Sequence, residues 1–418
     1  MTALPQVLIL SGVSGDTRRY RALHPVQQLR LAGVPCASAH LTSPNLEKAF
    51  EAAAVIILHR AAWDSRLESL VRRAQQRGAL VLGDTDDLVF DAAAFKWIDS
   101  PDFKDPIRAR LYRAEMLRHR QTLEACGTVI TSTEYLSGQV QAQLGKTAPV
   151  HRNAFSLEML ACAEAALKAR PAHPGRLVAG YASGTPTHDH DFALATPALQ
   201  AALARHPELE LWLVGPLQLD ESWNALLPRV KRCSFVPWRS LPQTLAQFDI
   251  NLAPLAMDNP FCQSKSEIKF MEAALVQTPT IASATPAFCH AIRSGENGFL
   301  ARSSGDWAAA LEALISQPEL RANMARQARQ DVLAAYAPQR MGRQLAALIE
   351  QAAGRPLWPE AELRPAAPPE AALDAAWEAH PTGAERALYT LRRRGPLTLL
   401  GLGWVFFRRL AAPIFPFR

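Results

Sequence analysis

The chain has 418 residues, of which 49% are hydrophobic and 20% charged, a composition typical of a globular protein large enough for two hydrophobic cores. Its net charge of +6 favours an anionic ligand or a membrane surface, and no basic run interleaved with aromatic residues points to nucleic acid as a partner. Six scattered cysteines without a C-x-x-C pair, and no signal-peptide pattern, predict free thiols in a cytoplasmic protein.

The first 170 residues alternate between short apolar strands and helices. We expect strands at 6–10, 54–58, 79–83 and 128–131, and helices at 20–32, 65–77 and 107–125. This alternation is typical of βαβ units, whose strands pair in a parallel sheet. Residues 1–170 are therefore predicted to form one Rossmann-like domain.

A break rich in proline and glycine at 169–175 predicts an interdomain linker, after which the alternation restarts. We expect strands at 177–181, 209–215, 250–253 and 280–283, and helices at 197–206, 241–248, 306–316 and 318–336. Residues 175–336 are therefore predicted to form a second Rossmann-like domain, followed by a returning helix at 337–353. Two doubly wound domains face each other across a cleft, and open α/β sheets bind ligands beyond the carboxyl ends of their strands.

The composition changes after residue 353. Residues 354–375 are rich in proline, alanine and glutamate and are predicted to be a flexible linker. Residues 376–418 form an amphipathic tail in which aromatic residues lie between basic ones. This tail is too short in apolar residues to span a bilayer, and we expect residues 392–418 to contact a membrane surface. The alternative is a terminal helix docked on the protein itself.

The segment 264–274 is the most informative part of the chain. It is predicted to be a helix that opens with small and basic residues, and a helix N-terminus attracts phosphate. Lys265 and Lys269 lie four residues apart, on one face of such a helix, and Glu272 follows near the same face to accept hydrogen bonds from a ribose. This pattern predicts a nucleotide diphosphate ligand. A surface helix with a solvated Lys/Glu face is the alternative.

With this helix in the second of two doubly wound domains, the chain resembles the GT-B glycosyltransferases, and among them the retaining family 4, also called group 1. The resemblance spans about residues 5–350, and its strongest part is Lys269-Phe270-Met271-Glu272 followed by 278–283. It implies an α/β fold of GT-B architecture, with Glu272 holding the nucleotide ribose. The chain departs from the family pattern at Ser264, where many members carry a second glutamate, at Gln277, and in the missing Arg-x5-Lys phosphate pair.

The resemblance also implies where the donor binds. The loop after the first strand, expected near the donor phosphate and the acceptor, contains Gly12. The small-residue turn after strand 177–181 contains Ser183, Gly184 and Thr185, and the next strand ends at Gly215. The segment that reads the base contains Val236 and Trp238, and the phosphate helix adds Ser264 and Ser266.

On the acceptor side, Asp86 falls where many family members have a histidine, so it is a candidate to orient the acceptor hydroxyl. His59, Arg60 and Asp87 are expected nearby. The alternative for Asp86 is an N-cap or loop carboxylate. Asp84-Thr85-Asp86 is formally a D-x-D metal motif, and His188-x-His190 has metal-ligand chemistry, but we expect no metal at either.

The resemblance implies a glycosyltransferase that moves a hexosyl or deoxyhexosyl group from a UDP-, dTDP- or GDP-linked donor to a glycan or lipid-linked acceptor in surface polysaccharide biosynthesis. Lys265 and Lys269 are expected to stabilise the departing diphosphate, with Asp86 in a positioning role, no divalent metal and retention of configuration. We expect a protein of the cytoplasm or of the inner face of the plasma membrane. A nucleotide-sugar epimerase and a non-catalytic GT-B scaffold are the alternatives.

Overall fold

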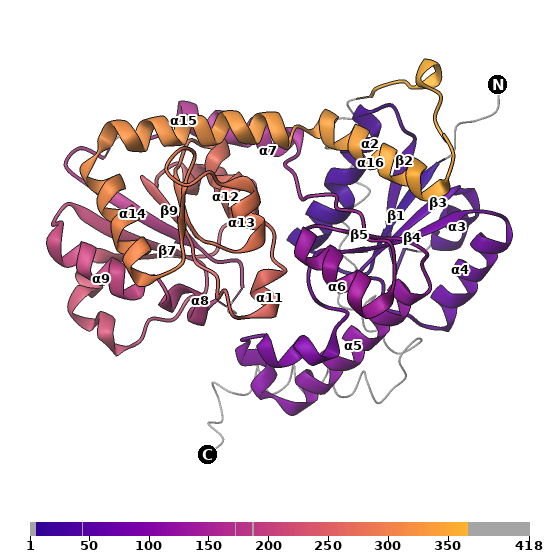
Figure 1. The fold of residues 1–418 in the computed structure, drawn as a ribbon, viewed down its shortest axis with the longest axis horizontal. Coiled ribbons are helices and arrows are strands. Elements are labelled where there is room, and N and C mark those ends of the chain that lie inside the picture. The colour runs from indigo at the N-terminus through magenta and orange to yellow at the C-terminus, as the bar shows by residue number, and fades with distance from the viewer. Residues whose placement is uncertain (1–5, 44, 172, 186–187, 367–418) are drawn as a thin grey trace.

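The computed structural model describes residues 6–43, 45–171, 173–185 and 188–366, and these form two α/β lobes (Figure 1). The N-terminal lobe has a five-stranded parallel sheet in the order β2-β1-β3-β4-β5. Its strands are β1 (Val7–Ser11), β2 (Cys36–His40), β3 (Val55–His59), β4 (Leu80–Thr85) and β5 (Val129–Thr131). Its α-helices are α1 (Asp16–Arg18), α2 (His24–Leu31), α3 (Leu46–Ala52), α4 (Ser65–Gln76), α5 (Pro106–Glu124) and α6 (Glu134–Leu144). Helix α7 (Leu157–Lys168) follows them in the chain but lies against the C-terminal lobe (Figure 1).

The C-terminal lobe has a six-stranded parallel sheet in the order β11-β10-β9-β6-β7-β8. Its strands are β6 (Leu177–Ala182), β7 (Leu209–Val214), β8 (Val230–Cys233), β9 (Ile250–Ala253), β10 (Thr280–Ser283) and β11 (Phe299–Ala301). Its helices are α8 (Asp189–Ala193), α9 (Thr196–Arg205), α10 (Leu241–Leu245), α11 (Pro260–Gln263), α12 (Ile268–Leu275), α13 (Pro286–Ala291), α14 (Ser304–Ser316) and α15 (Pro318–Ala335). This strand order reverses between β6 and β9, where doubly wound sheets open a ligand crevice.

Both sheets are buried on their two faces. Every residue of β1, β3, β9 and β10 is buried, which is typical of parallel strands covered by helices on each side. Tyr20 of the N-terminal lobe belongs to a hydrophobic cluster that also contains Met159 of α7 and Phe270 and Met271 of α12. The lobes therefore share part of one apolar core. The predicted α/β fold with two Rossmann-like domains is confirmed.

The chain crosses between the lobes a second time near its end. Helix α16 (Pro338–Ala353) follows α15 and returns to the N-terminal lobe, where it packs on α2 (Figure 1). Gly342 makes this close approach possible, because a Cβ atom there would lie 1.8 Å from the carbonyl oxygen of Gln28.

The described part of the predicted flexible linker is packed against the N-terminal lobe. The backbone N–H groups of Leu357 and Trp358 donate to Glu350 Oε1 at 2.8 and 3.1 Å, and the N–H of Ala366 donates to Arg30 O at 3.0 Å. Trp358 is buried. The prediction of a flexible linker is wrong for residues 354–366, because the apolar side chains in this proline-rich segment find a surface to cover. The remainder, including the amphipathic tail 376–418 and the region 392–418, lies outside the described residues.

The segment 264–274 is not one helix. Helix α11 ends at Gln263, and α12 begins at Ile268. The residues between them, including Lys265 and Ser266, lie in a turn. In this turn Ser264 Oγ donates to Phe261 O at 2.7 Å, and Glu267 Oε1 accepts from Tyr336 Oη at 2.6 Å. These side-chain hydrogen bonds replace the expected first helical turn. Lys265 and Lys269 therefore do not share a helix face. Helix α12 has no side-chain cap. The N–H of Phe270 donates to Glu267 O at 3.0 Å, whereas the N–H groups of Ile268 and Lys269 have no hydrogen bond among the described residues and are left for a ligand.

Candidate functional site

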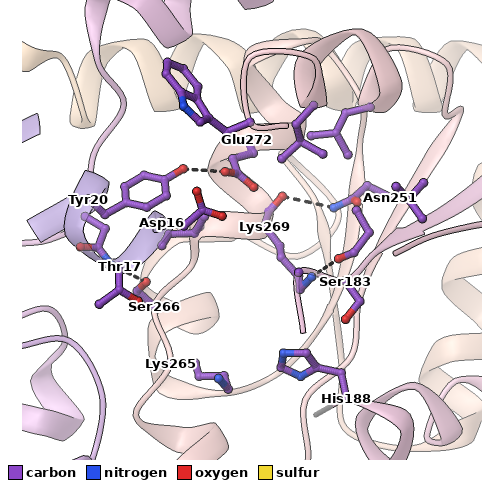
Figure 2. A pocket seen from close by; sticks show the side chains of 18 of the residues that line it. Asp16, Thr17, Tyr20, Ser183, His188, Asn251, Lys265, Ser266, Lys269 and Glu272 are labelled. Atoms are coloured by element: carbon purple, nitrogen blue, oxygen red, sulfur yellow. Dashed lines mark hydrogen bonds between the residues drawn. The ribbon is translucent and has the colours of Figure 1, made fainter. Parts of the chain in front are cut away.

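A pocket with a cavity volume of about 260 Å³ lies between the two lobes (Figure 2). The C-terminal lobe supplies the ends of β6, β7 and β9, the segment from Phe235 to Leu245, and the turn and helix from Lys265 to Glu272. The residues that the N-terminal lobe contributes to the wall are Asp16, Thr17, Tyr20, Asp86, Asp87 and Asn153. The pocket therefore lies beside β6 and β9, where the strand order of the C-terminal sheet reverses. This is the region in which the sequence predicted that the donor binds.

Glu272 lies in the wall of this pocket and is hydrogen-bonded across the cleft. Tyr20 Oη donates to Glu272 Oε1 at 2.6 Å, and the two side chains point toward one another in Figure 2. Burial raises the pKa of Glu272, against the opposing effect of the nearby Arg19 guanidinium. The carboxylate has a second oxygen and further lone pairs, so it has the acceptor capacity that a ribose diol requires.

Arg19 lies beside this pair and also contacts Trp238, in the segment from Phe235 to Leu245. Its guanidinium is 4.7 Å from the ring centroid of Trp238 and 4.5 Å from that of Tyr20, and its Nη2 is 3.9 Å from Glu272 Oε1. Asp16 accepts from Arg19 Nη2 at 3.1 Å. Arg19 and Tyr20 both come from a π-helical turn, Arg19–Leu23, a local geometry frequent at functional sites.

Two lysines give the other end of the pocket a positive charge. Lys269 Nζ donates to the carbonyl of Ala182 at the end of β6, and burial lowers the pKa of Lys269 to about 8. Lys265 Nζ lies 5.2 Å from the centroid of the Phe261 ring. Both ammonium groups lie near the uncapped N-terminus of α12, so an anion placed there meets two cations and backbone N–H donors.

The small-residue turn after β6 comes close to this positive end. Ser183 and Gly184 line the pocket, and Ser183 Oγ donates to Thr185 O at 2.8 Å. Gly215 supports the turn from behind, because it has a φ of +88° and a Cβ atom there would lie 2.0 Å from Ser183 O. Thr185 and Gly215 therefore shape the turn without lining the pocket.

An ion-pair network holds the acceptor-side carboxylates. Arg60 Nε donates to Asp86 Oδ1 at 2.6 Å and its Nη2 donates to Asp87 Oδ2 at 2.5 Å, while His59 Nε2 lies 3.4 Å from Asp86 Oδ1. Burial would raise the pKa of Asp86, but the charges of Arg60 and Arg21 and the hydrogen bond with His59 together outweigh burial and lower that pKa. Asp86 is therefore a stable anion at the pocket wall, which suits orientation of a hydroxyl more than proton abstraction.

The two carboxylates of the D-x-D sequence each pair with an arginine. Asp84 is buried and accepts from Arg21 Nε at 3.0 Å and from Arg21 Nη2, while Asp86 is held by Arg60. In the part of the chain that the structure describes, no three His, Cys, Asp or Glu side chains are grouped to hold a metal ion. Among the same residues, none of the helices combines the length and the apolar character needed to cross a bilayer.

The structure brings most of the predicted site residues to one pocket. Those that line it are Asp86, Asp87, Ser183, Gly184, Val236, Trp238, Lys265, Ser266, Lys269 and Glu272. Ser264 is fully buried with its hydroxyl bonded to Phe261 O, so it faces away from the pocket. Gly12 packs against Arg60, where a Cβ atom would lie 2.1 Å from the Arg60 carbonyl oxygen, and His59 and Arg60 stand behind Asp86.

Sequence reasoning missed the residues that reach the pocket from outside the recognised motifs. Tyr20 is the most important, because it occupies the carboxylate of Glu272. Asn153 also lines the pocket and donates to Ser266 Oγ at 2.8 Å. Asn251, within β9, also lines it. Only the closing of the two lobes places Tyr20 and Asn153 here, and no local pattern in the sequence encodes that.

Comparison with protein families identifies the C-terminal lobe. Residues 178–317 match the family described as Glycosyl transferases group 1. No curated protein sequence matches the chain. The group 1 resemblance inferred from the sequence is confirmed for this lobe, which holds Lys265, Lys269 and Glu272.

Comparison with solved structures extends the fold assignment to both lobes. Sucrose-phosphate synthase from Thermosynechococcus elongatus is 16% identical with a TM-score of 0.55, covering 84% of this chain and 99% of that one. A glycosyltransferase from Rickettsia africae is 11% identical with a TM-score of 0.56, and the match covers 84% of this chain and 98% of that one. Anabaena Alr3699/HepE, solved with UDP and glucose, is 15% identical with a TM-score of 0.51, and the match covers 83% of this chain and 100% of that one. These likenesses show that both lobes share the GT-B fold. The group 1 match of residues 178–317 identifies the C-terminal lobe as a glycosyltransferase domain.

Proposed function

We propose that this glycosyltransferase moves a hexosyl or deoxyhexosyl group from a UDP-, dTDP- or GDP-linked donor to a glycan or lipid-linked acceptor in surface polysaccharide biosynthesis. The observation that carries the proposal is that Glu272, Lys265 and Lys269 lie together in the pocket between the lobes. A carboxylate with diol-accepting capacity at one end and two cations at the other match a nucleotide diphosphate. The HepE structure with UDP-glucose supports a donor of this class.

The charges of the pocket favour departure of the diphosphate. Negative charge grows on the leaving phosphate as the glycosidic bond breaks, and preorganised donors aimed at developing charge are usually the largest catalytic contribution. Lys265, Lys269 and the first N–H groups of α12 lie where that charge would be stabilised. We propose that they do so without a divalent metal and with retention of configuration, while Asp86 orients the acceptor hydroxyl.

Nucleotide binding tests the donor site. We expect one of UDP, dTDP and GDP to bind in calorimetric titrations, and Glu272→Gln to weaken that binding by about tenfold or more, because a charge-assisted hydrogen bond to the ribose is lost. Glu312→Gln is the matched control, since Glu312 pairs with Arg205 and lies outside the pocket. Equal affinities for wild type and Glu272→Gln would contradict the ribose assignment.

Turnover separates sugar transfer from the alternatives. We expect release of the nucleoside diphosphate from its sugar to depend on an added glycan or lipid-linked acceptor, and to persist with a metal chelator because lysines supply the positive charge. Conversion of the donor without an acceptor would indicate the epimerase. Binding with no turnover against any acceptor would favour a non-catalytic scaffold.

The basic and aromatic residues of 392–418 lead us to propose a site of action at an anionic membrane surface. We expect the full chain to sediment with vesicles containing anionic phospholipid and a variant lacking residues 385–418 to remain in the supernatant. Equal partitioning of the two proteins would end this proposal.

A further inference from the structure

His188 is a titratable side chain at the positive end of the pocket that no step above uses. It lines the pocket, and its side chain is 10% exposed. Figure 2 shows its ring beside Lys265 and below Lys269, facing the same space as both ammonium groups. This space adjoins the uncapped N-terminus of α12, where the diphosphate is proposed to bind.

Asp191 fixes the orientation of this ring. His188 Nδ1 lies 2.8 Å from Asp191 Oδ2, so Nδ1 carries the proton that the carboxylate accepts. The other oxygen, Asp191 Oδ1, accepts from the N–H of Ala256 at 2.9 Å and from Cys262 Sγ at 3.3 Å. Asp191 is itself held by the loop after β9 and by α11, so it fixes the ring with Nε2 left for the pocket. No hydrogen bond to Nε2 occurs among the described residues.

The charges around His188 are set to respond to an anion. Burial lowers the pKa of His188, the Asp191 hydrogen bond opposes that shift, and the ammonium groups of Lys265 and Lys269 add to it. Cys262 and Tyr181 face Asp191 from α11 and β6, and burial raises the pKa of Cys262 to about 12, so its thiol stays neutral. In the pocket without a ligand, a protonated His188 is thus a third positive charge that Lys265 and Lys269 repel. The negative charge of a bound diphosphate offsets this repulsion.

We propose that His188, oriented by Asp191, binds the diphosphate of the donor through a protonated Nε2, so that the protein takes up a proton when the nucleotide binds. This inference rests on the proposed function. It assigns a phosphate-binding role to His188 and a positioning role to Asp191, and it makes donor affinity depend on pH near neutrality.

The pH dependence of binding tests the inference. We would measure the affinity of the tightest of UDP, dTDP and GDP from about pH 6 to about pH 8.5, for wild type and for His188→Gln. The phosphate ionisation of the ligand is common to both proteins and cancels in their ratio. We expect wild type to bind about tenfold more tightly near the acidic limit and the ratio to approach one near the alkaline limit, since one pKa unit corresponds to a tenfold change.

Proton uptake gives a second readout. Calorimetry of wild type in buffers of different ionisation enthalpy should show protons taken up on binding, and His188→Gln should show fewer. Asp191→Asn should reduce the uptake as well, because the ring loses the partner that stabilises its charged form. His190→Gln is the matched control, since His190 is exposed in α8, which begins directly after His188, and does not line this pocket.

A charge-fixed variant guards against a folding defect in His188→Gln. His188→Lys should bind the nucleotide with little proton uptake and should exceed wild type near the alkaline limit. Should no nucleoside diphosphate bind wild type, the proposed function itself fails. Should the nucleotide bind wild type with an unchanged pH profile in both His188 variants, the proposed function stands and the inference on His188 is overturned.

Discussion

At the scale of single residues, the hydrogen bond between Tyr20 and Glu272 bears directly on the proposed donor site. The hydroxyl of Tyr20 binds the carboxylate that is proposed to hold the ribose, and Arg19 lies over Trp238, in the segment proposed to contact the base. Burial raises the pKa of Tyr20 well above its ordinary value, so this hydroxyl remains a donor. A nucleotide must therefore displace a hydrogen bond of the unligated protein.

Removing this hydroxyl should strengthen nucleotide binding. For Tyr20→Phe we expect the affinity for the nucleoside diphosphate to rise about threefold to tenfold, because a hydrogen bond worth about 0.5–1.5 kcal/mol no longer competes. The unligated variant should be less stable in thermal unfolding by a similar free energy. Both quantities are measured by calorimetry.

Tyr336→Phe is the control for that experiment. Tyr336 Oη donates to Glu267 Oε1 at the same 2.6 Å, yet neither residue lines the pocket. We expect this variant to lose stability without any gain in affinity. A weaker nucleotide affinity in Tyr20→Phe would mean that Tyr20 supports the ligand instead of competing with it.

The contacts that Arg60 and Gly12 make near the predicted acceptor side could not be predicted from the sequence. Arg60 has a φ of +40°, a conformation uncommon outside glycine, and it aims the guanidinium at both Asp86 and Asp87. Gly12 was predicted from its motif, but its role is the close approach to the Arg60 backbone. A motif locates such residues along the chain, whereas the partner that explains them is far away in sequence.

At the scale of elements, the packing of α16 on α2 determines how the end of the chain is attached. A Cβ atom at Gly342 would lie 1.8 Å from Gln28 O and 3.3 Å from Ala32 Cβ. Backbone cannot yield as a flexible side chain does, so the helices must move apart to admit a methyl group.

Gly342→Ala should therefore lower the free energy of unfolding by about 1–3 kcal/mol in denaturant titrations. Gly138→Ala is the matched control, since Gly138 lies inside α6 with nothing within 4 Å of the added Cβ. Alanine favours a helix interior over glycine by about 1 kcal/mol, so this control should gain stability. A gain in Gly342→Ala as well would show that α16 does not pack on α2 as closely as described.

The sequence predicted elements well where apolar runs were long. Strands β1, β3, β4, β6, β7 and β9 lie within a few residues of their expected positions. It missed β2, whose sequence of small and polar residues carries little strand signal, and β8, which is largely exposed at the sheet edge. The break between α11 and α12 was also missed, because it depends on Arg152 and Tyr336 holding Glu267 from other parts of the chain.

At the scale of the whole molecule, the site exists only because the lobes are held together. Arg152 Nη1 donates to Glu267 Oε1 at 3.1 Å, Asn153 donates to Ser266, and Tyr20 donates to Glu272. With the hydrogen bond from Thr133 Oγ1 to Ser264 O at 3.4 Å, these contacts join the N-terminal lobe to the turn and helix that carry the cations. The sequence predicted a cleft and its donor half. The relative position of the lobes, and hence the residues that each lends to the other, follows from packing over the entire chain.

The most direct measurement is a crystal structure of the protein with the nucleoside diphosphate that it binds most tightly. The account predicts the diphosphate between Lys265, Lys269 and the first turn of α12, and the ribose hydroxyls on Glu272 with Tyr20 displaced. A nucleotide bound outside this pocket, or one whose ribose leaves the Tyr20–Glu272 hydrogen bond intact, would contradict it.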